Sequence, residues 1–183
     1  LHTTLDRTIQ ATGWFTPVLI TTEHFPEYLA LIERTSCQDQ QAELIITLLK
    51  QLLAAGVSIH RYYFETDPRH CYPESNHFAT FTLSELAELH PNHGLMMFSE
   101  GNCLFHTGQL VPWLSQFSPW TKRTLFTLVA PDQWGKREHF LEQANFLVLP
   151  AQEAGFKYLM TQLHTNTWQS YQTASLSARS WHS

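Results

Sequence analysis

The sequence predicts one α/β domain, a three-layer Rossmann-like or flavodoxin-like sandwich built on a mainly parallel, five-stranded sheet. Strand-like and helix-like segments alternate along residues 26–164, a pattern typical of a parallel sheet covered on both faces. Three of the strand-like segments (LALI, LMMF and FLVL) are almost continuously apolar, as expected for parallel strands buried on both sides. The length of 183 residues also suits a single domain.

The clearest elements form a strand–helix–strand unit near the start of the domain. Residues 27–33 (EYLALIE) are predicted to form the first strand, and Ser36 with Asp39 has the spacing of a helix N-terminal capping box. Apolar residues recur every three or four positions along 42–53, which predicts an amphipathic helix. The aromatic and β-branched run 57–65 (VSIHRYYFE) then predicts the second strand, joined to the first by a right-handed crossover.

The remaining segments continue the alternation up to residue 163. A polar loop is expected at 66–80, a short helix at 84–90, and strands at 94–99 and 124–129. A helix is then expected at 132–143, a strand at 145–149 and a final helix at 153–163. Residues 101–121 show no clear period, apart from a predicted helical turn near 113–117. Residues 1–25 are expected to be an N-terminal extension. The polar residues 165–183 are expected to be a tail that is mobile or docks elsewhere.

Composition excludes several classes of function. The formal net charge of −5 argues against a nucleic-acid binder, and no apolar run approaches the roughly 18–20 residues that cross a bilayer. Three widely spaced cysteines without a CxxC indicate a reducing, cytoplasmic setting rather than a disulfide framework. Only 15% of the residues are charged, so we expect a protein partner or neighbouring domains to cover part of the surface. The chain begins at Leu1 rather than Met, which suggests a piece of a longer protein.

Two acidic loops are predicted to meet at one edge of the sheet. If the strand order is 2-1-3-4-5, the switch point lies between the first and third strands, where ligands gather in such sheets. The loops after these strands supply Glu33, Thr35 and Ser36 on one side and Glu100 on the other. Carboxylate and hydroxyl oxygens could hold Mg²⁺. The simpler expectation is that these are solvated carboxylates near a helix N-terminus, with no cofactor bound and Ser36 acting only as a cap.

These two loops resemble the metal-ion-dependent adhesion site of the von Willebrand factor A domain. That family carries Asp-x-Ser-x-Ser after its first strand and an acid before Gly after a later strand. Here the two motifs read ERTSC at residues 33–37 and SEG at 99–101, with Glu for Asp in both and Cys37 in place of a hydroxyl. The family also uses a Thr from a middle loop and usually has two strands where only one is predicted here. The resemblance implies the same fold with a degenerate or absent metal site.

A longer stretch, from PEYLALIERTS to FLVLPA, resembles a domain of multidomain bacterial proteins that carry formylglycine-generating-enzyme-like or signalling modules. This resemblance implies an accessory or regulatory segment. Because no catalytic motif such as GxSxG, Walker A or GxGxxG is present, we predict a non-catalytic protein-interaction or regulatory module of a larger bacterial protein. Trp113 and Trp120, each next to a proline, are its predicted docking surface, although core and edge packing is the simpler expectation for both rings.

Three catalytic or signalling alternatives remain open. A metal-dependent hydrolase or phosphoesterase would use the acids at strand ends, namely Glu33, Glu65, Asp67 and Glu100. A Cys–His hydrolase would pair Cys103 with His93 or His106. A phosphoacceptor receiver domain would need Asp where Glu100 stands. The eleven histidines show no HxH, HxxxH or HExxH spacing, and most are predicted to be surface residues.

Overall fold

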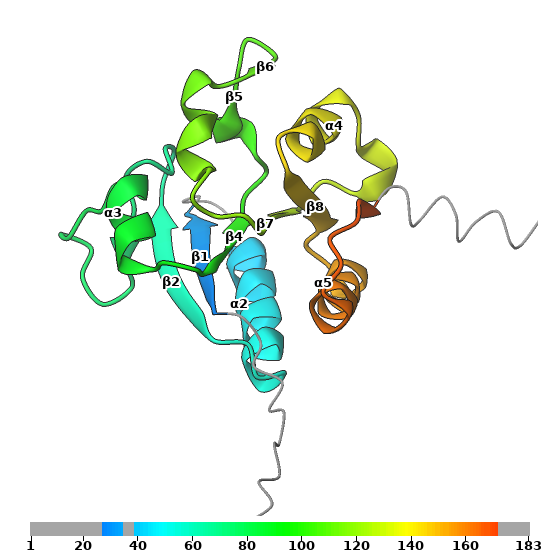
Figure 1. The fold of residues 1–183 in the computed structure, drawn as a ribbon, viewed down its shortest axis with the longest axis horizontal. Coiled ribbons are helices and arrows are strands. Elements are labelled where there is room, and N and C mark those ends of the chain that lie inside the picture. The colour runs from blue at the N-terminus through cyan, green and yellow to red at the C-terminus, as the bar shows by residue number, and fades with distance from the viewer. Residues whose placement is uncertain (1–26, 35–38, 172–183) are drawn as a thin grey trace, which may run out of the picture.

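A mainly parallel six-stranded sheet forms the centre of the domain (Figure 1). The computed structural model describes residues 27–34 and 39–171. Five strands run parallel: β1 (Tyr28–Glu33), β2 (Ile59–Phe64), β4 (Gly94–Phe98), β7 (Arg123–Thr127) and β8 (Phe146–Pro150). A short strand, β3 (Tyr72–Pro73), pairs antiparallel with the edge of β2. The order is β3-β2-β1-β4-β7-β8, so the expected order of the five parallel strands is confirmed.

Helices cover both faces of the sheet, as predicted for a three-layer domain. One face packs against α2 (Asp39–Ala54) and α5 (Glu153–Thr165), and the other against α3 (Leu83–Leu89), the 3-10 helix η2 (Pro112–Phe117) and α4 (Lys136–Gln143). The buried residues between the sheet and α2 and α5 are called the first core, and those on the opposite face the second core. Successive residues of β1 face alternate sides, so Tyr28 packs in the first core and Leu29 in the second. Every residue of β4 is buried, which explains its apolar sequence.

Three segments differ from the sequence-based expectation. The predicted loop 66–80 contains β3. The segment 101–121 contains the 3-10 helix η1 (Asn102–Leu104) and a small hairpin, β5 (Phe105–His106) and β6 (Gln109–Leu110), before η2. The predicted helix at 132–143 is divided into the 3-10 helix η3 (Pro131–Gln133) and α4. The division falls at Gly135, whose N–H donates to the Glu138 carboxylate at 2.7 Å and so sets the start of α4.

The first part of the predicted C-terminal tail packs onto the domain. Asn166 ends α5 in a left-handed conformation, and the chain then turns back. The Gln162 side-chain oxygen accepts a hydrogen bond from the Gln169 N–H at 2.9 Å, and Trp168 and Tyr171 pack against the first core. The predicted extension 1–25 and residues 172–183 lie outside the described residues. None of the described helices has the length and apolar character needed to cross a membrane.

Candidate metal centre

The two acidic loops predicted to meet do lie together at the carboxyl ends of β1 and β4. The Ser99 hydroxyl donates a hydrogen bond to a carboxylate oxygen of Glu33 at 2.7 Å and accepts one from the Gly101 N–H at 2.8 Å. Ser99 is only 2% exposed and Glu33 is half-buried, so this bridge is a partly buried link between the loops. The Glu33 carboxylate therefore already has a hydroxyl partner from the loop that follows β4.

Of the remaining members of the predicted oxygen site, only Glu100 lies within the described residues. Glu100 is exposed and accepts a hydrogen bond from the Asn102 side chain at 3.0 Å. Thr35 and Ser36 lie outside the described residues, so the predicted Mg²⁺ site stays a prediction. Asp67, a ligand in the hydrolase alternative, is held by Arg69 through several hydrogen bonds, the shortest 2.6 Å, and these lower the pKa of its carboxyl.

The predicted docking surface of Trp113 and Trp120 is wrong for Trp120. Trp120 is 2% exposed and packs in the second core beside Phe117, so it cannot present its ring to a partner. Trp113 is half-buried, and the Arg69 guanidinium lies over its ring at 4.9 Å. Core packing, the simpler expectation for both rings, holds for Trp120, since an aromatic ring in an irregular segment can fill the core beneath it.

The Cys–His hydrolase alternative is disfavoured by the state of the thiols. Burial, and secondarily the nearby Glu33 carboxylate, raises the pKa of Cys103 to about 12. Burial likewise raises the pKa of Cys71 to about 12. A nucleophilic cysteine needs a lowered pKa, because the thiolate is the reactive form. Neither thiol has the environment of a catalytic group.

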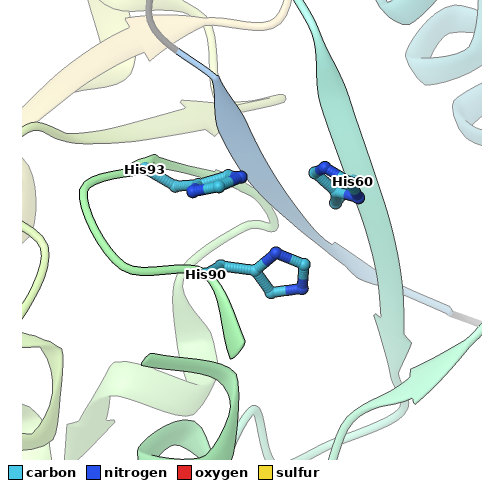
Figure 2. Close-up of side chains that lie close together, drawn as sticks. All are labelled: His60, His90 and His93. Carbon is cyan, nitrogen blue, oxygen red and sulfur yellow. The ribbon is translucent and has the colours of Figure 1, made fainter. Parts of the chain in front are cut away.

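Three histidines converge at the opposite, amino-terminal end of the sheet. His60 is the second residue of β2, His90 follows the last residue of α3, and His93 directly precedes β4. One ring nitrogen from each lies within 4.8 Å of the others, and Figure 2 shows the rings turned toward one another. The ring centroids are 4.7 to 5.3 Å apart. Among the described residues, this is the one group of three His, Cys, Asp or Glu side chains that could hold a metal ion.

The local structure explains why these rings meet. A capping box between Thr82 and Glu85 begins α3, and the His90 N–H donates to the Leu86 carbonyl as that helix ends. Asn92, with a φ of 68°, reverses the chain in the next turn and brings His93 back toward His90. His60 reaches both because β2 and β4 flank β1 on its two sides.

Hydrogen bonds orient two of the rings in the way that metal ligands require. His93 Nδ1 lies 3.2 Å from the Pro91 carbonyl oxygen, so this nitrogen carries the proton and Nε2 is the candidate ligand atom. His93 Nε2 is buried and 3.1 Å from a Glu27 carboxylate oxygen, but the two are not aligned for a hydrogen bond. His90 Nε2 lies 3.0 Å from the Tyr62 hydroxyl, which leaves Nδ1 for a metal.

The electrostatic environment favours the neutral, metal-binding form of His90. Burial lowers the pKa of His90, and the neighbouring rings of His60 and His93 lower it further. A neutral imidazole is the form that binds a transition metal. Without a metal, the same three rings would simply pack against one another as tilted aromatic rings, which is the structural alternative for this cluster.

Three imidazoles with a fourth position open suit Zn²⁺ better than a hard cation such as Mg²⁺. Zinc–nitrogen bonds of about 2.0–2.1 Å place tetrahedral ligand atoms about 3.3 Å apart, so the rings would have to draw slightly closer to bind it. His60 is exposed and can adjust its rotamer, whereas His93 and His90 are partly buried and held by hydrogen bonds. His60 also opens the site to solvent.

Comparison with protein-family models, with curated proteins and with solved structures found no match. The candidate site therefore depends on geometry alone. Sequence reasoning missed it because the three histidines come from three different elements. The one local signal was the HxxH spacing of His90 and His93 at the end of a predicted helix.

Proposed function

We propose that this domain is a non-catalytic, metal-dependent binding module that holds Zn²⁺ on His60, His90 and His93. The observation that carries the proposal is the convergence of three imidazole nitrogens within 4.8 Å, two of them in hydrogen-bonded rings. Three protein ligands leave the fourth coordination position of zinc free. A donor group from a partner protein would complete the coordination and so tie binding of the partner to the metal.

The surroundings of His60 support an extended peptide segment as the partner. β3 pairs only with Tyr62 and Tyr63, so the outer edge of β2 at residues 59–61 has no strand beside it among the described residues. A shallow, open cavity of about 430 Å³ runs along this edge, between β2 and the turn at Glu74. An extended segment could add to such an edge through its backbone. A histidine or carboxylate on that segment would reach the ion.

Calorimetric titration of the metal-free chain with Zn²⁺ tests metal binding. We expect one zinc ion per chain, and His60→Ala or His90→Ala should weaken binding by more than about 10-fold, since even loss of an outer-shell partner costs that much. His106→Ala, an exposed histidine on the β5–β6 hairpin, is the matched control and should bind as the wild type does. Equal losses in His60→Ala and His106→Ala would contradict the proposed site.

Substitution of Co²⁺ for zinc tests the open position. Because tetrahedral Co²⁺ absorbs visible light according to its ligands, adding a short histidine-containing peptide should change the spectrum of the loaded protein. The same peptide should leave the spectrum of a His60→Ala sample unchanged. A spectrum of the wild type that does not respond to peptide or to free imidazole would show a closed coordination shell and refute a binding role for the ion.

Metal-dependent hydrolysis is a second candidate, favoured by the position of Glu27. Its carboxylate lies 3.1 Å from His93 Nε2, beside the place that an ion would take, and could accept a proton from a metal-bound water. Glu27→Gln should then retain zinc affinity but abolish hydrolysis of nitrophenyl esters and phosphates by the loaded protein. Turnover by the wild type no faster than that of free Zn²⁺ would exclude this activity.

We also propose that the fold is von Willebrand factor A-like, with a degenerate oxygen site, in a cytoplasmic segment of a larger protein. Two features support the likeness. Along the chain, two strands (β2 and β3) come between β1 and β4, although β3 lies at the edge of the sheet, and the Glu33 and Glu100 loops follow the two strands at the switch point. We expect no saturable Mg²⁺ binding in calorimetry. A binding heat that Glu33→Ala/Glu100→Ala abolishes would show instead that the oxygen site is functional.

A further inference from the structure

A separate cavity lies at the amino-terminal ends of β7 and β8, on the opposite side of β1 from β2 and His60. Its volume is about 630 Å³, within the range of about 300–1,000 Å³ typical of small-molecule sites. Its walls come from the segment before β7, the first residues of β7 and β8, the end of α4, and the segment that follows α5. Three stretches of the chain that are distant in sequence, 118–123, 142–147 and 168–170, therefore line it.

Three hydrogen-bond donors on residues that line this cavity have no partner among the described residues. Arg123 Nε is buried and unpaired, and the indole nitrogens of Trp120 and Trp168 are in the same state. The Arg123 guanidinium lies over the Phe146 ring at 5.2 Å, and within the described chain no carboxylate forms an ion pair with it. Burial also lowers the pKa of Arg123. Buried donors and cations normally have partners, since leaving them unpaired destabilises the fold.

We infer that this cavity binds a small organic anion, a carboxylate carried on an aromatic or other apolar body. The planar guanidinium of Arg123 matches a carboxylate with two parallel hydrogen bonds. Trp120, Phe146 and Trp168 contribute aromatic walls suited to the apolar part of such a ligand. The inference is independent of the zinc site, because no residue is shared between them.

A carboxylate fits this cavity better than a phosphate because one wall is acidic. Glu142 also lines the cavity, and its carboxylate accepts a hydrogen bond from the Ser170 hydroxyl at 2.6 Å. That negative charge would repel a dianion more strongly than a monoanion. Arg123 and Glu142 thus give the cavity one positive and one negative wall. Arg123 should raise the affinity for an anion, and Glu142 should lower it.

Phenylacetate is the test probe, with phenylacetamide as its neutral analogue of the same shape. Binding to the full chain is measured by calorimetry and by the fluorescence of the cavity tryptophans. We expect saturable binding of phenylacetate, with Arg123→Gln weakening it at least about 10-fold through loss of the charge-assisted hydrogen bonds. Glu142→Gln keeps an acceptor for Ser170 and should bind phenylacetate a few-fold more tightly.

A general loss of structure would weaken phenylacetate binding in both variants. It cannot produce opposite changes in affinity for Arg123→Gln and Glu142→Gln. Arg137→Gln is the matched control, since Arg137 also lies over an aromatic ring, that of Phe105, at 5.0 Å, but outside the cavity. It should leave the phenylacetate affinity unchanged. Equal binding of phenylacetate and phenylacetamide, absence of saturable binding, or a shift in the same direction for Arg123→Gln and Glu142→Gln would each overturn the inference.

Discussion

Replacing Gly94 with alanine should destabilise the domain, because the space beside its Cα is filled by Tyr28. The two residues pair directly across β1 and β4. A Cβ atom at position 94 would lie 2.2, 2.6 and 2.8 Å from three carbons of the tyrosine ring, whereas carbon atoms pack comfortably at about 3.5–4.0 Å. Tyr28 is fully buried, so its ring has no free volume to enter. The ring or the strand must therefore shift by more than about 1 Å.

Overpacking of this kind costs about 1–3 kcal/mol, and the gain of about 0.5–1 kcal/mol from removing a flexible glycine from a strand offsets part of it. We therefore expect a net loss of about 1–2 kcal/mol in urea unfolding followed by circular dichroism. In thermal unfolding each kcal/mol corresponds to about 2–4 °C for a chain of this size. Ser118→Ala, an exposed substitution, is the control and should leave the stability nearly unchanged.

A double variant separates this steric conflict from a general intolerance of change at position 94. Tyr28→Leu shortens the obstructing side chain, so Tyr28→Leu/Gly94→Ala should lose less stability than the sum of the two single variants, by about 0.5–3 kcal/mol. Strictly additive losses, or a Gly94→Ala protein that unfolds at the same urea concentration as the wild type, would refute the reasoning.

Three further predictions follow from buried polar groups. Tyr28→Phe should be as stable as the wild type or more stable by up to about 2 kcal/mol in urea unfolding, because the buried hydroxyl has no hydrogen-bond partner within the described chain. Ser99→Ala should lose about 1–3 kcal/mol, because it breaks the partly buried hydrogen bond to the Glu33 carboxylate, whereas exposed Ser118→Ala should stay within about 0.5 kcal/mol. With the other two cysteines replaced by alanine, Cys103 should react very slowly with a thiol reagent at about pH 8, since its pKa of about 12 keeps it protonated. Glu33→Gln should speed that reaction, because removing a negative charge lowers the pKa of the thiol; an unchanged rate would contradict this cause.

The strands and the long helix could be predicted because their apolar periods are strong and local. Burial of β4 on both faces requires the continuous run GLMMF, and the spacing of Ile45, Leu49 and Leu52 in α2 matches one buried helix face. The short antiparallel strand β3 escaped prediction because two residues ending in Pro73 carry the composition of a loop.

The β5–β6 hairpin has a sequence signal in its turn that was not used to predict it. Its two-residue turn is Thr107-Gly108, and both residues have positive φ angles, 48° and 79°. Such a turn favours glycine at its second position, as here, but threonine at the first is unusual and conceals the pattern. Pro131 and Gly135 likewise marked the break in the predicted helix before α4.

The candidate site was the hardest feature to predict because its residues come from separate elements, which only the order of the strands brings together. The sequence correctly predicted that the loops of Glu33 and Glu100 lie together at the switch point, since the strand order alone determines that these loops are neighbours. His60 and His93 approach each other only because β2 and β4 lie on either side of β1, at the ends of the strands where no site was sought. Whether Trp120 faced the core or the solvent depended on how an irregular segment folds over the sheet, and no periodic pattern determines that.

The most direct test of the zinc site is X-ray absorption spectroscopy of the zinc-loaded chain. Three imidazole nitrogens and one further light atom at about 2.0–2.1 Å are expected around the metal, and one imidazole should disappear from the spectrum of His60→Ala. A sulfur ligand at about 2.3 Å, a shell of oxygens only, or a spectrum that His60→Ala leaves unchanged would show that the three histidines do not hold the ion.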